Sequence, residues 1–347
     1  MQRKEFLRNA GLLLAGTATS KIGKAEMMQD NAGPIIIPPY LKPGDTIGIT
    51  SSAGYILENE LKPAVEQLRS WGLNVELGKT IGQRWGTFGG TDEQRIEDFQ
   101  YMLNASHIKA IMCARGGYGI VRIIDRIDFS SLKKTPKWII GFSDVTVFHC
   151  HIHTNCNIAT LHSKMCNSFP DFWDKAPELQ KQTIISIKQA LFGEKMQYNA
   201  SINSYNKPGI GKGILIGGNL RTIENLAGTN SDINTEGKIL FVEDRDEYPY
   251  NMDRMFWSLK RTGKLEKLAG LVIGGFKPKV DPGIVDKFEI PLYDIVLEKI
   301  KEYNYPVCFD FPVGHQVNNY AYKCGIAHQL TVNNQGVFLE EVRYDKL

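Results

Sequence analysis

A serine that follows a predicted buried strand is the first residue whose surroundings suggest chemistry. The apolar run Trp138–Gly141 predicts a short strand, and the turn around Ser143 and Asp144 then leads into a helix predicted from Val145 to Asn155. A side chain at such an elbow projects above the edge of a sheet, and the helix N–H groups point at negative charge forming nearby. Ser143 is therefore a candidate nucleophile, although a helix cap formed by Ser143 or Asp144 explains the same pattern.

A glycine-rich loop follows another predicted strand. A buried strand is predicted at Lys109–Cys113, and it is followed by Ala114-Arg115-Gly116-Gly117-Tyr118-Gly119. Glycines let backbone N–H groups approach a ligand closely, because no Cβ intervenes. A tight turn explains the loop equally well, and its spacing fits neither the dinucleotide fingerprint nor the phosphate-binding loop.

Two residues in the second half also follow predicted strands. Glu243 comes directly after the apolar run Lys238–Val242, where a carboxylate can be held rigidly, although acidic residues at such positions are commonly solvated. His315 follows a strand near Cys308 and the glycine Gly314. A single histidine is more often structural than catalytic, so neither residue identifies a site alone.

A zinc site and a disulfide framework are both disfavoured. His149, His151 and His153 alternate along a predicted helix, where side chains two residues apart point in different directions and cannot share one metal. The six cysteines form no Cys-x-x-Cys pair, and several lie in apolar stretches, which predicts buried free thiols.

The order of predicted elements indicates an α/β protein. Thr46–Thr50 predicts the first strand, and Thr91-Asp92-Glu93-Gln94 predicts a capping box that opens a helix. A polar linker is expected near 197–208. The other predicted strands are 158–162, 211–220, 271–275 and two strands within 322–342 around a turn at 333–336, and the other predicted helices are 58–71, 175–191, 250–261 and 291–303.

Length and composition predict a globular protein of two domains. The chain has 347 residues and 42% hydrophobic residues, enough for a sizeable core in each domain. Its 41 Lys+Arg against 38 Asp+Glu give a formal net charge of +3, without a long basic run. Nucleic acid is therefore not expected as a partner.

The first 25 residues read as a secretory signal. Charged residues from Arg3 to Arg8 precede a short apolar run, Ala10–Ala18, and small residues up to Ala25. The opening is similar to a twin-arginine signal, with Lys4 in place of the second arginine. The apolar run is too short to span a bilayer, and an amphipathic helix or a disordered tail is the alternative.

Several of these motifs together resemble one family. In this order along the chain, they are similar to the signature of the serine LD-carboxypeptidases, whose other branch is the microcin self-immunity peptidases. The resemblance covers roughly 36–342, and its motifs are Gly89–Arg95, Ala114–Gly119, Gly141–Asp144, Gly217–Leu220, Leu240–Asp244 with Tyr248-Pro249-Tyr250, and Pro312–His315.

The resemblance implies a hydrolase of two domains. After the signal at 1–25, residues 36–195 would form a Rossmann-like α/β nucleophile domain related in shape to class I glutamine amidotransferases. A linker at 196–208 would lead to a smaller β-rich α+β domain at 209–347, which carries the glutamate and histidine of a triad. The active site would then lie between the two domains.

The resemblance also assigns roles to individual residues. Ser143 would be the nucleophile, His315 the general base and Glu243 the residue that orients His315. The oxyanion hole would be formed by two backbone N–H groups. One belongs to Asp144 and the other to a glycine of the Gly116–Gly117 pair, here assigned to Gly117. The residues expected to contact substrate are Arg115, Gly116, Tyr118 and Asn219, and Arg115 would either bind a terminal carboxylate or form a structural ion pair.

The activity implied is the release of a terminal D-alanine from a muropeptide tetrapeptide, without a metal or cofactor. An immunity-type peptidase acting on an acyl-sulfamoyl nucleotide and a non-catalytic peptidoglycan-binding module are the alternatives. A glutaminase is disfavoured because the elbow carries a serine where those enzymes use cysteine. We expect a periplasmic protein without stable membrane insertion, with the cytoplasm as the alternative location, and a homodimer as its assembly.

Overall fold

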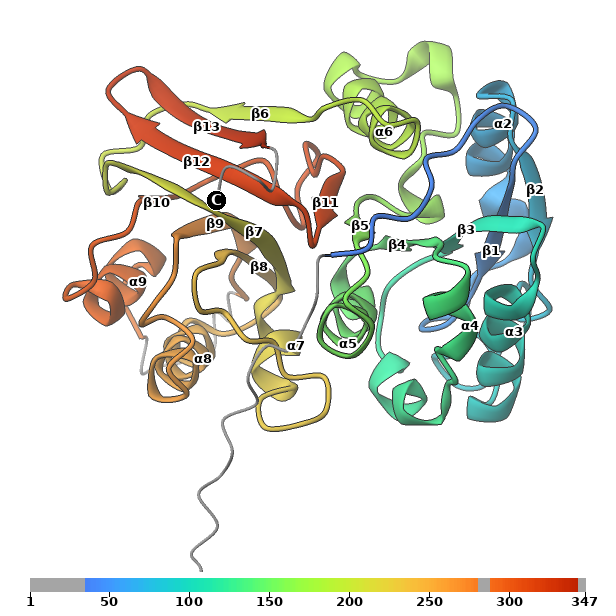
Figure 1. Cartoon of the computed structure of the whole chain (residues 1–347), viewed down its shortest axis with the longest axis horizontal. Helices are drawn as coiled ribbons and strands as arrows, with labels where there is room; N and C mark the ends of the chain where they lie inside the picture. The colour runs from blue at the N-terminus through green and yellow to red at the C-terminus, as the bar shows by residue number, and fades with distance from the viewer. Residues whose placement is uncertain (1–34, 280–287, 343–347) are drawn as a thin grey trace, which may run out of the picture. The chain divides into compact units, whose positions relative to one another are not determined.

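The computed structural model describes residues 35–279 and 288–342, which contain two β-sheets (Figure 1). The described residues belong to one compact unit. The predicted signal, 1–25, lies outside them. The first sheet is formed mainly by the N-terminal half of the chain and the second by the C-terminal half.

The first sheet has the order β11-β5-β4-β3-β1-β2, with β11 (Tyr322–Cys324) at one edge. Its first five strands along the chain run parallel. Buried apolar side chains lie on both of its faces, as expected for a parallel sheet covered by helices. The parallel strands are β1 (Thr46–Thr50), β2 (Asn74–Leu77), β3 (Ile108–Cys113), β4 (Trp138–Gly141) and β5 (Thr160–His162), and the helices are α2 (Lys62–Ser70), α3 (Asp92–Asn104), α4 (Ser130–Lys134), α5 (Thr146–Cys156) and α6 (Glu178–Leu191).

The capping box predicted for α3 is confirmed. The Gln94 N–H donates to the Thr91 hydroxyl at 3.3 Å, and the Thr91 N–H donates to the Gln94 side chain at 2.8 Å. Two N–H groups that the helix itself cannot satisfy thereby gain acceptors, which fixes where α3 begins.

The second sheet has the order β10-β9-β8-β7-β12-β13-β6 and is mixed. Neighbours from β10 to β7 are parallel, and those from β7 to β6 are antiparallel. Its elements are β6 (Gln197–Ala200), β7 (Gly209–Asn219), α7 (Leu220–Asn225), β8 (Ile239–Arg245), α8 (Pro249–Arg261), β9 (Gly270–Lys277), α9 (Leu292–Ile300), β10 (Val307–Cys308), β12 (Ala327–Asn333) and β13 (Gly336–Glu341).

Helix α5 lies where the two sheets meet (Figure 1). It packs on β4 and β5 of the first sheet and on β7 and α7 of the second half. The Asn219 N–H, at the end of β7, donates to the Thr146 hydroxyl at the start of α5 at 3.0 Å. The helix that follows the Ser143 elbow is therefore anchored to both halves of the chain.

The predicted fold class is confirmed, but two local predictions need correction. Residues 197–200, expected to be part of a linker, form β6, because Tyr198 points into the core while its polar neighbours face outward. Residues 322–342 contain three strands, because β11 (Tyr322–Cys324) separates from the hairpin of β12 and β13. Strand β11 instead joins the first sheet, antiparallel to β5.

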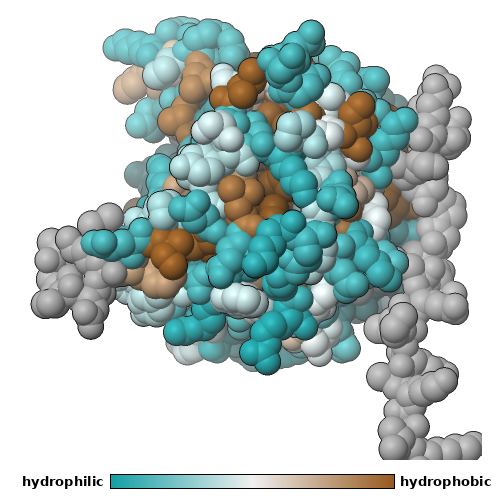
Figure 2. All heavy atoms as spheres, turned by 90° about the vertical axis from the view of Figure 1, so that its left-hand side faces the viewer, coloured by the Kyte–Doolittle hydropathy of each residue, from teal (hydrophilic) through white to brown (hydrophobic). Residues whose placement is uncertain are grey.

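The six cysteines are buried free thiols, as predicted. No helix within residues 35–279 and 288–342 is both long and apolar enough to cross a membrane. The face on the α9 side is mostly hydrophilic, with smaller hydrophobic areas between the hydrophilic ones (Figure 2). Such a mixture is ordinary for a surface that faces water.

Candidate active site

Ser143 occupies the strained turn between β4 and α5. Its φ is +63°, in the left-handed region that residues other than glycine rarely adopt. A single residue held in this conformation costs on the order of 1–3 kcal/mol. The same geometry marks the nucleophile elbow of α/β-hydrolases, because it exposes the serine hydroxyl above the sheet. The predicted strand-to-helix elbow is thus present.

The glycine-rich loop approaches this serine closely. A Cβ atom built on Gly116 would lie 3.0 Å from the Ser143 Cβ and 3.2 Å from its Oγ. A larger residue at position 116 would therefore crowd the hydroxyl. Neither the Gly117 N–H nor the Asp144 N–H has a protein acceptor within the described residues. Both groups belong to segments that line the same cavity as Ser143.

His315 and Glu243 form a hydrogen-bonded pair. The distance between His315 Nδ1 and Glu243 Oε2 is 2.5 Å, and the backbone N–H of His315 donates to the same oxygen at 3.2 Å. Glu243 is fully buried, at the carboxyl-terminal part of β8. A carboxylate on Nδ1 holds the proton there, which leaves Nε2 as the acceptor.

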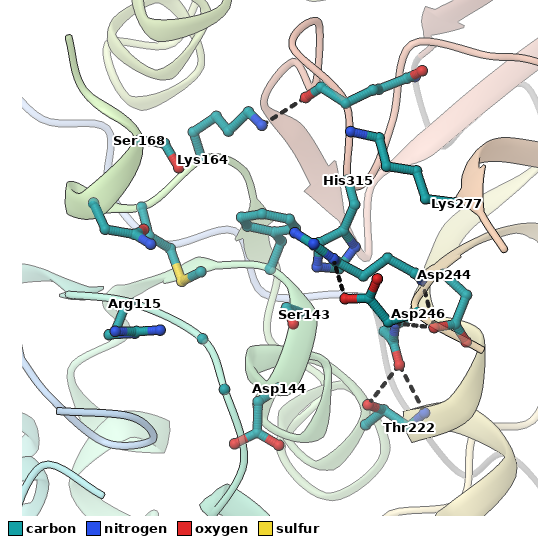
Figure 3. Close-up of a pocket in the computed structure, with 18 of the residues that line it drawn as sticks. Arg115, Ser143, Asp144, Lys164, Ser168, Thr222, Asp244, Asp246, Lys277 and His315 are labelled. Carbon is teal, nitrogen blue, oxygen red and sulfur yellow. Dashed lines mark hydrogen bonds and ion pairs between the residues drawn. The ribbon is translucent and has the colours of Figure 1, made fainter. Parts of the chain in front are cut away.

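Ser143 and His315 line one cavity of about 1020 Å³ (Figure 3). Ser143 follows β4 of the first sheet, whereas His315 is held by Glu243 on β8 of the second. The ring of Phe142 lies between these parts, with its centroid 4.9 Å from that of His315. The two halves of the chain thus supply complementary groups: a hydroxyl from one and an oriented imidazole from the other.

The residues predicted to contact substrate all line this cavity, but two of them also have structural contacts. Arg115 Nη1 donates to the Tyr55 carbonyl at 3.2 Å. Asn219 caps α7 and donates to Asp244 Oδ1 at 3.1 Å. Tyr118 is 55% exposed, and its hydroxyphenyl ring is available at the cavity surface.

Asp144 ties the glycine-rich loop to the elbow through its side chain. Its Oδ2 accepts the Ile120 N–H at 2.9 Å, directly after the loop. Burial raises the pKa of the Asp144 carboxyl to about 6, and the backbone N–H donors and the nearby Arg95 oppose this shift. The Asp144 side chain therefore positions the glycine-rich loop relative to the elbow.

Replacing Asp144 with asparagine should change how stability depends on pH. Because the folded pKa is about 6 and the ordinary value is 3.8, proton binding stabilises the fold below pH 4, and this stabilisation is lost as pH rises to 6. The asparagine side chain does not titrate. We therefore expect the stability of the variant relative to wild type, measured by chemical unfolding, to be about 2.4 kcal/mol more favourable at pH 7 than at pH 4. Parallel stability curves would contradict the raised pKa.

Lys164 and Lys277 line the cavity as well, although neither was singled out from the sequence. Each lies at or just after the carboxyl end of a strand, Lys164 after β5 and Lys277 in β9. That position is the signal that could have found them, because side chains at strand ends converge on a shared site in α/β sheets.

The histidines of α5 contact different partners instead of converging on one point. His149 contacts Thr160 and the Gly141 carbonyl, whereas His151 contacts Ser231. Within residues 35–279 and 288–342, no group of three or more His, Cys, Asp or Glu side chains is arranged to hold a metal ion.

Known proteins are similar to this chain in sequence or in fold. A probable murein peptide carboxypeptidase from Bacillus subtilis is 34% identical over 80% of this chain and 86% of its own length. The muramoyltetrapeptide carboxypeptidase of Oxalobacter formigenes has a TM-score of 0.76 and 25% identity, over 86% of this chain and 99% of that one. The microcin C7 self-immunity protein MccF, solved with glutamyl sulfamoyl guanosine, has a TM-score of 0.78 at 22% identity, over 90% and 99%.

The family models agree with these likenesses. The model of the LD-carboxypeptidase N-terminal domain matches residues 47–163, which include the Ser143 elbow, and that of the C-terminal domain matches residues 212–330, which include Glu243 and His315. The chain belongs to the LD-carboxypeptidase family.

Proposed function

We propose that the protein is a serine-type LD-carboxypeptidase that releases the terminal D-alanine from muropeptide tetrapeptides during peptidoglycan turnover. The observation that carries this proposal is the His315–Glu243 pair, whose histidine lines the same cavity as the strained Ser143. The names of the Bacillus and Oxalobacter relatives support a substrate derived from murein.

In the proposed reaction, His315 activates Ser143. The imidazole Nε2 takes the hydroxyl proton while Oγ attacks the carbonyl carbon of the bond between the L-configured centre and D-alanine. Glu243 keeps the proton on Nδ1 and stabilises the imidazolium that forms. His315 then protonates the leaving amine, and water hydrolyses the resulting acyl ester on Ser143 by the same proton transfers.

The oxyanion hole is proposed to consist of the Gly117 and Asp144 N–H groups. Both lack protein acceptors in the described part of the chain, so both are available to developing negative charge. A preorganised donor of this kind is commonly worth about 3 kcal/mol of transition-state stabilisation. The Asp144 side chain keeps the two donors together, because it binds the loop at Ile120.

The test is mass spectrometry of a tetrapeptide, with an L-centre before its terminal D-alanine, after incubation with the protein. We expect equal amounts of tripeptide and free D-alanine. A peptidyl sulfamoyl nucleotide, incubated in parallel, tests the immunity-type alternative that the MccF likeness raises. Binding of the tetrapeptide without cleavage would instead support a non-catalytic peptidoglycan-binding module.

Replacing Gly314 with alanine should displace His315. Gly314 has a φ of +103°, and a Cβ there would lie 2.4 Å from the Glu243 Cβ. We expect a loss of about 2–4 kcal/mol in unfolding free energy and a fall in kcat of roughly 100-fold. Gly263 is the matched control, because its φ is +75° and a Cβ there meets nothing within 4 Å. Equal activity loss in both alanine variants would contradict the proposed contact.

We also propose that the protein works in the periplasm after removal of the signal at 1–25. Mass analysis of the mature N-terminus should then show a start near Glu26. An intact Met1 on protein recovered only from the cytosolic fraction would contradict export and support the cytoplasmic alternative.

A further inference from the structure

Two lysines on the His315 side of the cavity have no role in the mechanism above. Lys164 follows β5 and Lys277 ends β9, and both line the cavity (Figure 3). We propose that Lys164 and Lys277 together form the subsite that binds the free carboxylate of the residue released by the reaction. This inference rests on the proposed carboxypeptidase function and specifies how an exopeptidase would recognise its substrate end.

The Lys164 ammonium is fixed next to the catalytic histidine. Its Nζ donates to the carbonyl of Gln316, the residue after His315, at 2.6 Å. The same Nζ lies 5.4 Å from the centroid of the Phe142 ring, and that ring lies 4.9 Å from the His315 ring. Lys164 thus contacts two neighbours of His315: Gln316, which follows it in sequence, and Phe142, whose ring lies next to it in space.

This position suits the leaving residue because of the chemistry of His315. The imidazole must protonate the leaving amine, so that amine has to lie against His315. In an α-amino acid the carboxylate is attached to the same carbon as the amine. The carboxylate of the leaving residue must therefore also lie close to His315, and Lys164 and Lys277 line the same cavity as this histidine.

The charges in the cavity leave these ammonium groups available. Lys277 forms no ion pair with any described residue, and Lys164 contacts a neutral carbonyl. The acidic side chains of the cavity are already engaged: Asp144 by the Ile120 N–H, Asp244 by the Arg221 and Arg245 N–H groups, Asp246 by the Arg245 guanidinium and Glu247 by the Asn251 amide.

Electrostatics around Lys164 favour an incoming anion. Burial lowers the pKa of the Lys164 ammonium to about 8, and the positive charges of Lys277 and Arg245 add to this shift, which Glu243 opposes. A carboxylate bound between the two ammonium groups would offset both the desolvation and the mutual repulsion.

Arg115 is the competing candidate, and its contacts place it elsewhere. Its guanidinium donates to the Tyr55 carbonyl and packs against Gly54, where a Cβ would lie 3.1 Å from Arg115 Nε. In Figure 3, Arg115 lies to the left of Ser143, whereas Lys164 and Lys277 both lie above it. These contacts give Arg115 a structural role, because they hold the glycine-rich loop against the segment around Gly54 and Tyr55.

The experiment measures binding rather than turnover, in full-length protein carrying Ser143→Ala. Calorimetry compares a tetrapeptide ending in a free D-alanine carboxylate with the same peptide ending in D-alaninamide. We expect the carboxylate to bind roughly 10- to 100-fold more tightly, the range of a charge-assisted hydrogen bond. Adding Lys164→Met or Lys277→Met should reduce this ratio to within about threefold, because methionine keeps the apolar stem and removes the charge.

Two further variants serve as controls in the same background. Lys62→Met removes a lysine whose side chain is 74% exposed on α2, and it should leave the carboxylate-to-amide ratio unchanged. Arg115→Met should lower affinity for both peptides by a similar factor, with the ratio preserved.

The proposed subsite would be overturned if the carboxylate-to-amide affinity ratio were unchanged in both cavity-lysine variants. It would also be overturned if only Arg115→Met abolished the preference for the carboxylate. Equal binding of the carboxylate and the amide before any lysine is changed would overturn it too. Failure of the proposed function has a different signature, because wild-type protein would then leave the tetrapeptide intact whatever the binding ratios are.

Discussion

Replacing Ser143 with alanine is expected to lower kcat on the tetrapeptide by roughly 10⁴- to 10⁶-fold, the range seen when a triad nucleophile is removed. In the proposed mechanism this hydroxyl forms the acyl ester, and alanine has no group that can do so. Peptide affinity should change little, because the glycine-rich loop and the cavity lysines remain. Steady-state kinetics and calorimetry on the same preparation measure the two effects separately.

Ser143→Gly is the matched variant for the strain at this position. Glycine adopts a φ of +63° without the cost that serine bears, so this variant should be inactive and yet more stable than wild type by about 1 kcal/mol. Near-wild-type turnover by either variant, in protein free of contaminating hydrolase, would show that Ser143 is not the nucleophile. A less stable glycine variant would show that the elbow is not strained.

Replacing Glu243 with glutamine is expected to lower kcat by roughly 10³- to 10⁴-fold, as when the orienting carboxylate of a triad becomes an amide. The amide cannot stabilise the imidazolium, and its NH₂ group can donate to Nδ1 and so favour the wrong tautomer of His315. Because Glu243 is fully buried and accepts two bonds from His315, no water or neighbour can supply the missing charge. Steady-state kinetics on the tetrapeptide measures this loss.

Asp244→Asn is the matched control for Glu243→Gln. Asp244 is the next residue on β8 and is also buried, but it binds the Asn219 amide and the backbone of Arg221 and Arg245 instead of His315. Its loss of activity should stay below about tenfold. A comparable loss in the two variants would mean that charge in the cavity, rather than the contact with His315, explains the effect.

The nucleophile elbow could be predicted from sequence because its signals are local. An apolar run ends at Gly141, a serine follows shortly after it, and a helix begins at once, so neighbouring residues determine where Ser143 points. Glu243 could be singled out for the same reason, as the first charged residue after the apolar run Lys238–Val242. The pairing of Glu243 with His315 came only from the family resemblance, because 72 residues separate them.

The features that sequence reasoning missed depend on distant parts of the chain. Strand β11 pairs with β5 across about 160 residues, and no local pattern distinguishes joining that sheet from continuing into the hairpin of β12 and β13. Lys164 and Lys277 become neighbours only because their strands, in different sheets, end at one cavity. Strand β6 forms because Tyr198 is buried in the core, although the composition around it is that of a linker.

The most direct test of the proposed nucleophile is to trap the acyl group on the protein. A depsipeptide with D-lactate in place of the terminal D-alanine should acylate faster than the acyl ester is hydrolysed, because an alkoxide leaves more easily than an amine. Rapid acid quenching followed by peptide mapping should then find the tripeptide acyl group on the fragment that contains Ser143, and His315→Ala should prevent its formation. An acyl group on any other residue, or its undiminished formation without His315, would contradict the account.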